Sequence, residues 1–311
     1  MKYIIALDIG GTKIAGALFK RNILIKKVNL KTHARKGKEF VIKKIIEVIS
    51  LLKEGINKEN ILGIGIGMPG PVNHKTGIIH FTPNMSGWVN VPLRNILEKK
   101  FKVRVIVEND TNCAALAESI YHQCNNLICI TIGTGLGGGV IINGEIYHGC
   151  GVAGELGHMV IKFDGPKCNC GNKGCLEEFV SGRGIERISK KIFNKKIDPK
   201  TLQGMAERGN RRAIEVYKEL GKLLGVGLAN LANIFNPEMV VIGGSISKAK
   251  KLFLKEAVKE MKKRAFTVSI HNLKVVISEL GDNAGLIGAA ALVSQELKRN
   301  FTYLKNILML H

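Results

Sequence analysis

The chain has 311 residues, which is enough for one large domain or for two ordinary domains with cores of their own. Its composition, 45% apolar and 23% charged, excludes a disordered chain, and no stretch approaches the ~20 consecutive apolar residues of a membrane span. The apolar run at residues 3–7 is short and ends at Asp8, so we expect neither a signal sequence nor a membrane partner. A cytoplasmic location is the expectation that follows.

A net charge of +22 raises the question of a nucleic-acid partner. The lysines of residues 38–58 are interleaved with Ile and Val at helical spacing, which is typical of a solvated helix face. Aromatic residues make up only 5% of the chain, so few side chains could stack on bases. We interpret the charge as a solvated surface and expect no nucleic-acid partner, with a polyanion as the alternative.

Short runs of Val, Ile and Leu, broken by glycine, alternate with helical patterns along the chain, which predicts an α/β protein. Strands are predicted in the first half over residues 3–8, 13–19, 23–30, 61–67 and 103–108, and then over 126–132, 139–142, 145–147, 239–243 and 273–278. Helices are predicted over residues 38–54, from Asp110 onward, and over about 210–235, 247–264 and 284–298.

The pattern contains an internal repeat at an offset of 123 residues. Residues 8–18 and residues 131–141 each read as a strand, a turn rich in Gly and Thr, and a second strand. A repeat of this kind predicts two similar domains whose turns can face each other across a cleft.

The first of these turns is suited to binding an anion. Glycines let backbone N–H groups approach a phosphate closely, and a hydroxyl and an ammonium group add to them; the residues are Gly10, Gly11, Thr12 and Lys13. Asp8, at the end of the preceding strand, could hold Mg²⁺ through water. The alternative is a hairpin that needs its glycines only for their backbone angles.

The second turn repeats this chemistry with Gly133, Thr134 and Gly135. A third glycine pair, Gly243 and Gly244, ends a predicted strand and could lie against an adenosine. The Gly-x₄-Gly-Lys-Ser/Thr pattern of a Walker loop is absent from the sequence. The three turns together predict a nucleotide site of another kind.

Asp110 stands where a predicted strand, ending in Glu108-Asn109, runs into a helix. An Asp at this point could simply cap the helix. It could also be the base of a phosphoryl transfer, which needs an aligned acceptor hydroxyl and a nearby group to take its proton. In that interpretation Asn109 would hold a sugar by hydrogen bonds.

Seven cysteines are present, and three of them lie within eight residues, which in a reducing compartment indicates a metal site before it indicates disulfides. With the nearby His158, the thiols of Cys168, Cys170 and Cys175 match a closed tetrahedral Zn²⁺ site. Four protein ligands leave no open position, so the zinc would be structural, and the second imidazole nitrogen of His158 would be available to a substrate. The other cysteines are expected to be buried thiols: Cys113, Cys124, Cys129 and Cys150.

Taken in order, these motifs resemble those of the ROK family (repressors, open reading frames, kinases), and among its members the bacterial-type glucokinases. The motifs are Asp8-Ile9-Gly10-Gly11-Thr12-Lys13, Pro69-Gly70-Pro71, Pro83-Asn84 with Trp88, Glu108-Asn109-Asp110, Gly133-Thr134-Gly135, Glu155-Leu156-Gly157-His158, and the cysteine motif that runs from Cys168 to Glu177. The cysteine motif after Glu-x-Gly-His is the most specific of them, whereas many actin-like ATPases share the first glycine turn.

The resemblance implies an actin-like ATPase (ribonuclease H-like) duplicated fold, with two α/β domains around a cleft. We expect a small domain over residues 1–112, completed by a C-terminal helix at 293–311, and a large domain over 113–292 that carries the zinc motif and the oligomer contacts. Members of the family are usually homodimers or homotetramers. The segment 295–311 continues beyond the family pattern, and it suggests a helical face without indicating a function.

The resemblance also implies an ATP-dependent hexose kinase in which Asp110 is the base. Sugar contacts would come from Gly70, Asn84, Asn109, Asp110, Glu155, His158 and Glu177. ATP with Mg²⁺ would lie along Gly10–Lys13, Gly133–Gly135 and Gly243–Gly244, and structural Zn²⁺ would be held by His158, Cys168, Cys170 and Cys175.

Glucose, phosphorylated to glucose 6-phosphate, is the expected reaction. The alternatives within the family are kinases of N-acetylmannosamine, N-acetylglucosamine or fructose. A sugar-responsive transcription repressor is the alternative of another class, and we disfavour it because Asp8 leaves no room for a helix-turn-helix domain before the first glycine turn. An inactive zinc-bearing scaffold is disfavoured because Asp110, Lys13 and Glu155 are all present.

Overall fold

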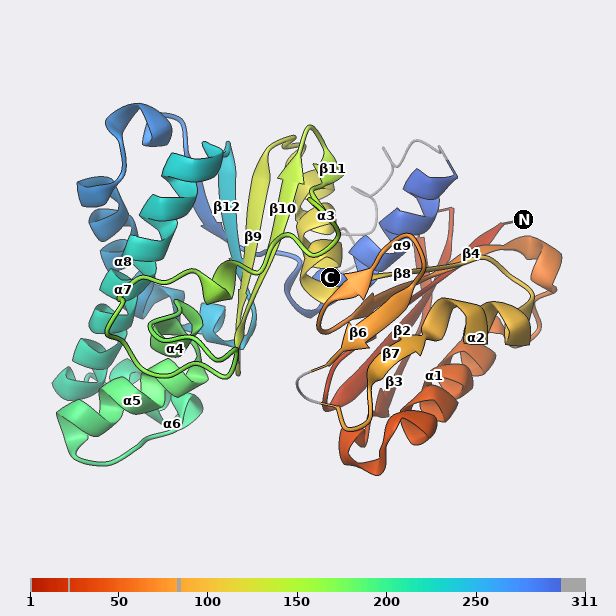
Figure 1. The fold of residues 1–311 in the computed structure, drawn as a ribbon, viewed down its shortest axis with the longest axis horizontal. Helices are drawn as coiled ribbons and strands as arrows, with labels where there is room; N and C mark the ends of the chain where they lie inside the picture. Colours follow the sequence, from red (N-terminus) through yellow and green to blue (C-terminus); the bar gives the residue numbers. More distant parts are fainter. Residues whose placement is uncertain (1, 22, 83–84, 298–311) are drawn as a thin grey trace. The chain divides into compact units, whose positions relative to one another are not determined.

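The computed structural model describes residues 2–21, 23–82 and 85–297 (Figure 1). Contacts divide the chain into two compact units: unit 1 is Met1–Cys124, Val140–Ala153 and Asp282–His311, and unit 2 is Asn125–Gly139 and Gly154–Gly281. The division into domains of residues 1–112 and 113–292 stays a prediction. None of the helices in the described ranges is both long and apolar enough to cross a membrane.

Two five-stranded sheets have matching topologies (Figure 1). The first has the order β3-β2-β1-β4-β8, with strands Ile23–Lys31, Lys13–Lys20, Tyr3–Ile9, Ile61–Met68 and Val105–Asn109. The second has the order β11-β10-β9-β12-β13, with strands Glu145–Ile146, Leu136–Ile142, Leu127–Ile132, Met239–Gly243 and Lys274–Ile277. In each sheet the three strands at one end run parallel. The same order in both sheets confirms the duplication that the repeat predicts.

Strand β4 shows how the sequence builds unit 1. Its residues alternate between glycine and a large apolar side chain, and successive residues of a strand face opposite sides of the sheet. On one side a Cβ atom added to Gly65 would lie 1.8 Å from the carbonyl oxygen of Ala289 in α9 (Ala284–Glu296). A Cβ added to Gly67 would lie 3.4 Å from the Cα of Asp110, the first residue of α3 (Asp110–His122). The glycine side therefore admits α9 at backbone distance, whereas α3 lies at an ordinary contact distance from Gly67.

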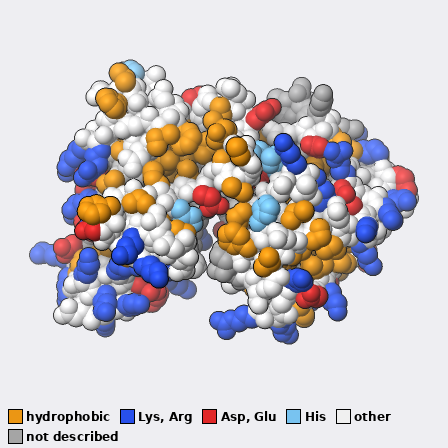
Figure 2. Space-filling view, viewed as in Figure 1, with side chains coloured by type: hydrophobic (Ala, Val, Ile, Leu, Met, Phe, Trp, Pro, Cys, Tyr) orange, Lys and Arg blue, Asp and Glu red, His pale blue; other side chains and the backbone are white. Residues whose placement is uncertain are grey.

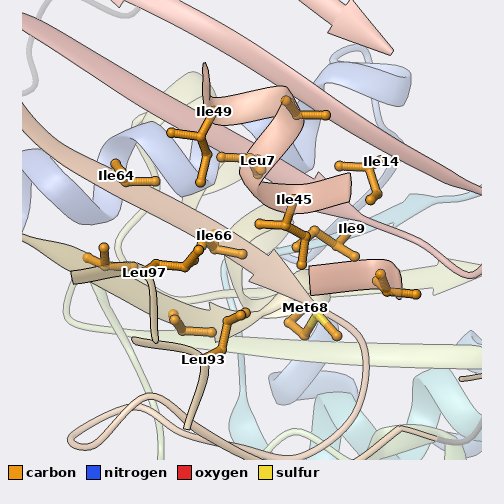
Figure 3. Close-up of a cluster of buried hydrophobic side chains, with 14 of the residues drawn as sticks. Leu7, Ile9, Ile14, Ile45, Ile49, Ile64, Ile66, Met68, Leu93 and Leu97 are labelled. Atoms are coloured by element: carbon orange, nitrogen blue, oxygen red, sulfur yellow. The ribbon is translucent and has the colours of Figure 1, made fainter. Parts of the chain in front are cut away.

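The other side of the same sheet carries the main apolar core of unit 1 (Figure 3). Ile64, Ile66 and Met68 of β4 are buried there against α1 (Lys38–Lys53) and α2 (Leu93–Phe101). Leu7 and Ile9 of β1 join them, and all five are at most 1% exposed. Burying such side chains contributes about 1.5–3 kcal/mol each, so this side supplies much of the stability of the unit.

In unit 2 a long helix, α7 (Arg211–Phe235), packs on α8 (Lys250–Arg264) through two small residues. Cβ atoms added to Gly221 and Gly225 would lie 2.5 Å and 2.6 Å from carbonyl oxygens of α8. The two helices therefore approach each other closely. The remaining helices of this unit are α4 (Glu177–Val180), α5 (Gly182–Phe193) and α6 (Pro199–Glu207).

Several elements differ from the sequence prediction. Helices α2, α4, α5 and α6 and the small sheet of β5 (Val72–Asn73), β6 (Ile78–Phe81) and β7 (Val89–Pro92) were not predicted. Strand β10 begins at Leu136 rather than at 139, and a 3₁₀ segment precedes α8, which begins at Lys250 rather than at 247. Cys113, Cys124 and Cys129 are buried as expected, but Cys150 is exposed, so that expectation was wrong.

Two predicted features lie outside the described residues: the sugar contact of Asn84 and the C-terminal helix of residues 293–311, except for its first residues in α9.

The positive charge is spread over the face of the molecule that Figure 2 shows. In the view of Figure 2 the Lys and Arg side chains are scattered over both units rather than gathered in one block. Many lie beside acids, as Lys44 does 2.7 Å from Glu47 and Arg264 does 2.7 Å from Glu260. This distribution agrees with a solvated surface.

The glycine side of β4 yields a prediction of stability. We expect Gly65→Ala to lower the free energy of unfolding by about 2–4 kcal/mol, because the new methyl group meets a backbone oxygen that cannot turn away. The control is Gly204→Ala in α6, where the nearest atoms are the end of the flexible Arg208 side chain and alanine improves helix propensity. Urea unfolding of both variants measures the difference; equal stabilities would contradict the packing argument.

Candidate functional site

Three parallel strands of unit 1 bring its candidate residues to one edge of the sheet. Strands β1, β4 and β8 all run in the same direction, so their carboxyl ends lie side by side. Asp8 is near the end of β1, Gly70 follows β4, and Asn109 and Asp110 stand where β8 passes into α3. The carboxyl edge of parallel strands is the usual place for a ligand in α/β proteins.

The cap of α3 is Asn109 and not Asp110. The side-chain oxygen of Asn109 accepts hydrogen bonds from the backbone N–H groups of Thr111 (2.9 Å) and Asn112 (3.1 Å). Its amide nitrogen donates to the carbonyl oxygen of Gly70 at 3.2 Å. Asn109 thus joins the helix to the loop of Gly70, and Asp110 does not serve as the cap. A sugar contact of Asn109 stays a prediction.

Asp110 is half-buried in the first turn of α3. One of its oxygens accepts a hydrogen bond from the N–H of Thr111 at 2.7 Å. Burial raises the pKa of Asp110 above its usual value, and the hydrogen bonds from Thr111 partly oppose this shift. A carboxylate that binds a proton more readily is a better general base, provided that it is ionised at the working pH.

Asp8 lies in the electric field of Asp110. Burial, followed by the charges of Asp110 and Asp282, raises the pKa of Asp8 to about 7, although Lys13 and Lys27 oppose the rise. The positive charges of Lys13 and Lys27 therefore do not compensate for burial and for the neighbouring carboxylates. Asp8 suits a divalent cation that keeps most of its water shell, because Mg²⁺ is usually held by only one or two carboxylates.

The first glycine turn closes as a tight hairpin. The N–H of Gly10 donates to the carbonyl oxygen of Lys13 at 2.8 Å, and the hydroxyl of Thr32 donates to the carbonyl oxygen of Gly10 at 2.6 Å. Gly11 is partly exposed, and Thr12 and Lys13 are exposed. These groups are therefore accessible to an anion.

In unit 2 the other two glycine turns lie next to each other. The N–H of Gly133 donates to the carbonyl oxygen of Gly135 at 2.9 Å, with the exposed Thr134 between them. A Cβ atom added to Gly133 would lie 3.6 Å from the hydroxyl oxygen of Ser245, directly after Gly244. Strands β9 and β12 are parallel neighbours, which places both turns at one sheet edge.

Glu177 holds the turn at Gly135. One of its oxygens accepts a hydrogen bond from the N–H of Leu136 at 2.8 Å, and the other pairs with Arg183. A Cβ atom added to Gly135 would lie 2.5 Å from this carboxylate, so only glycine fits there without rearrangement. Both Glu177 oxygens thus have protein partners, which the sequence did not indicate, and its sugar contact stays a prediction.

The four predicted zinc ligands come together in unit 2. The ligand atoms of His158, Cys168, Cys170 and Cys175 all lie within 4.8 Å of one another. The sulfurs of Cys170 and Cys175 are 3.7 Å apart, as are the Cys168 sulfur and Nδ1 of His158. A disulfide needs about 2.05 Å. Tetrahedral zinc with Zn–S bonds of about 2.3 Å requires sulfurs about 3.8 Å apart, so the arrangement fits the metal.

The loop that carries these thiols depends on two glycines with left-handed backbones. Gly171 has φ +95° and Gly174 has φ +74°, and a Cβ atom at Gly174 would lie 1.6 Å from the carbonyl oxygen of Lys162. Burial raises the pKa of Cys168 and raises that of Cys175 to about 12, whereas the N–H of Asn172 lowers the pKa of the exposed Cys170. The backbone turns at Gly171 and Gly174 thus bring the three thiols together.

His158 connects the cluster to Glu155. Its Nδ1 faces the Cys168 sulfur, and its Nε2 lies 3.9 Å from a carboxylate oxygen of the exposed Glu155. The ring therefore offers one nitrogen to a metal and the other to Glu155 or a ligand beside it.

The pKa of Asp8 leads to a prediction. A group whose pKa is higher in the folded than in the unfolded protein favours folding most at low pH, and this contribution is lost as pH rises through the folded value. Without Mg²⁺, the stability of the wild type relative to Asp8→Asn should therefore fall between about pH 4 and pH 7, by on the order of 2–4 kcal/mol. Denaturant unfolding across this range measures the difference. The exposed Asp164→Asn is the control, and a difference independent of pH would contradict the assignment.

The candidate residues occur in a chain with clear relatives. The model of the ROK family matches residues 4–296. A glucokinase of Thermotoga maritima is 34% identical, over 94% of this chain and 98% of that protein. A xylose repressor of Caldicellulosiruptor bescii is 36% identical, over 84% of this chain and 70% of that protein.

Among solved structures, the ROK family glucokinase of Streptomyces griseus, determined in complex with glucose and AMPPNP, is similar with a TM-score of 0.79. It is 32% identical and the match covers 94% of this chain and 99% of that one. With the duplicated sheets, this similarity confirms the predicted α/β, actin-like ATPase fold. The family match and the identities together show that the chain belongs to the ROK family.

Proposed function

We propose that the protein is an ATP-dependent hexose kinase in which Asp110 accepts the proton of the attacking sugar hydroxyl. The observation that carries the proposal is the placement of Asp110 at the carboxyl edge of the sheet, with Asp8 beside it and its pKa raised by burial. The glucokinases among the relatives support the reaction type.

The proposed reaction is a direct in-line transfer of the γ-phosphoryl group of ATP. The sugar hydroxyl loses its proton to Asp110 as the oxygen attacks phosphorus and the bond to ADP breaks. Lys13 and the glycine turns at 10–13 and 133–135 would hold the phosphates, and Gly243–Gly244 would lie against the adenosine. Mg²⁺, held near Asp8 through water, would neutralise charge on the phosphates.

Glucose, phosphorylated at O6, is the substrate that we propose. Gly70, Asn84, Asn109, Glu155, His158 and Glu177 would contact it, with Asn109 also fixing the Gly70 loop. N-acetylmannosamine, N-acetylglucosamine and fructose are the alternative acceptors. A homodimer or homotetramer in the cytoplasm is the proposed form of the enzyme.

A repressor function is favoured by one observation, the similarity to xylose repressors. The face shown in Figure 2 gives it no support, because the basic side chains there are scattered, and some of the basic side chains pair with acids, as Lys44 and Arg264 do. Tight, sequence-specific DNA binding at physiological salt in a gel-shift assay would favour the repressor over the kinase.

The kinase proposal predicts the behaviour of Asp110→Asn. This variant keeps the shape of the side chain but cannot accept the proton, so kcat should fall by at least ~10²-fold while glucose affinity changes little. ADP release is measured for the wild type, for Asp110→Asn and for the control Asp164→Asn, with glucose, mannose, fructose, N-acetylglucosamine and N-acetylmannosamine. Glucose should have the highest kcat/KM. Near wild-type turnover in Asp110→Asn would disprove the base assignment.

We further propose that structural Zn²⁺ is bound by His158, Cys168, Cys170 and Cys175 and orients His158 for the sugar. Metal analysis should find about one zinc per chain. Cys170→Ser should lose zinc, melt at a lower temperature and bind glucose weakly, whereas Cys150→Ser, outside the cluster, should keep all three properties. A zinc-free protein of full activity and unchanged melting temperature would exclude this role.

A further inference from the structure

Next to Asp110 lies a buried carboxylate that the proposed reaction does not use. Glu108 is 3% exposed, and three donors converge on it. One oxygen accepts from the N–H of Asn109 (2.8 Å) and from the side-chain amide of Asn112 (2.9 Å). The other oxygen lies 2.7 Å from Nε2 of His148. An ionised carboxylate only accepts hydrogen bonds, so His148 donates from Nε2.

The His148 ring is itself held in place. It stacks on the ring of His74, with centroids 3.7 Å apart and planes inclined by 16°. His74 belongs to the turn between β5 and β6, and Arg94 of α2 fixes this turn by donating to the carbonyl oxygens of His74 (2.7 Å) and Lys75 (2.5 Å). Burial and the neighbouring His148 lower the pKa of His74. A lower pKa favours the uncharged form of the His74 ring at neutral pH, so the two stacked rings do not repel each other through like charges.

His148 also organises the loop that follows it. Its carbonyl oxygen accepts hydrogen bonds from the N–H groups of Gly151 (2.7 Å) and Ala153 (3.1 Å). The chain leaves unit 1 directly after this loop, between Ala153 and Gly154, and Glu155 is the next residue. The carbonyl group of His148 thus closes the loop, and its side chain holds the start of the loop to Glu108.

The cluster is not a metal site. Among the described residues, the groups of metal-ligating atoms close enough to share an ion lie between His158 and Glu178, and none includes Glu108, His74 or His148. Two imidazole rings stacked face to face also direct their nitrogen lone pairs side by side rather than toward a common centre. Hydrogen bonding of a buried charge is the chemistry that remains.

We propose that Glu108 and His148 form a positioning pair for the sugar site. The carboxylate fixes the turn of Asn109 and Asp110 through backbone and side-chain donors, and the imidazole ties to it the loop that runs into Glu155. One hydrogen bond thereby joins two segments of unit 1 that lie 40 residues apart in the sequence. This inference rests on the proposed function for its effect on catalysis, but not for the hydrogen bond itself.

Three variants test the pair. His148→Leu removes the donor, and His148→Gln can still donate from a nitrogen at nearly the same reach. His271→Leu, at an exposed histidine of unit 2, is the matched control. His148→Leu should raise the KM for glucose about 10-fold to 100-fold, the range for losing a hydrogen bond to a charged group, and leave the KM for ATP within about twofold. His148→Gln should recover most of the loss, and His271→Leu should behave as wild type.

Amide hydrogen exchange on the free protein tests the pair without any substrate. In His148→Leu the amides of Asn109, Gly151 and Ala153 should exchange faster, and in His148→Gln they should return toward wild-type rates. A wild-type protein that phosphorylates no sugar, with these exchange changes intact, would refute the kinase proposal and leave the pair standing. Unchanged exchange and unchanged KM in a folded His148→Leu protein would overturn the pair, as would equal losses in the Gln and Leu variants.

Discussion

The structure of unit 1 depends on the difference between the two faces of β4. Isoleucine and methionine on one face supply the apolar burial, while glycine on the other lets α9 approach the strand at backbone distance. The first turn of α3 lies beside Gly67, where an added Cβ would stand 3.4 Å from the Cα of Asp110, an ordinary contact distance. Gly288 of α9 in turn lies against the carbonyl oxygen of Cys113 in α3, where an added Cβ would come within 1.7 Å. Gly65 and Gly288 thus let α9 pack closely on both β4 and α3, the helix that begins at the candidate base.

The two duplicated sheets have the same strand order, but the side chains next to their glycine turns differ in chemistry. Both end a strand in a glycine turn, and in both the turn is closed by a hydrogen bond from its first glycine. In unit 1 the neighbouring groups are carboxylates, with pKa values raised by burial. In unit 2 the neighbouring carboxylate, Glu177, is neutralised by Arg183 and bound to the turn itself. A cluster of thiols and an imidazole follows, held by a loop with its own glycines. The same sheet architecture thus places carboxylates with raised pKa values near the turn of unit 1 and an ion-paired carboxylate near the turn of unit 2.

Much of this could be predicted from the sequence, for reasons that differ from residue to residue. The strands up to β4 and the long helices have strong periodicity, and the grouping of His158 with the three cysteines is indicated by residue type and spacing alone. Helix α2 and the small sheet were missed because their segments, of 9 residues for the helix and 2 to 4 for the strands, are too short to show a clear period. Only Asp110 was considered as a cap of α3, but Asn109 is the cap, since both side chains can accept N–H bonds of this kind. His148 carries no local signal at all, because its partner Glu108 is 40 residues away and only the fold brings them together.

The interrupted course of unit 1 has a consequence for how the chain folds during synthesis. Its segments flank the whole of unit 2 in the sequence, and α9, which covers the glycine face of β4, comes from the last of them. Ribosomes deliver the chain from its amino end, so every residue of unit 2 leaves the exit tunnel before α9 does. Until then the part of β4 around Gly65 lacks the helix that packs on it. Unit 1 therefore cannot complete its packing before all of unit 2 has been synthesised, and the contacts of α9 with β4 and α3 form after that point.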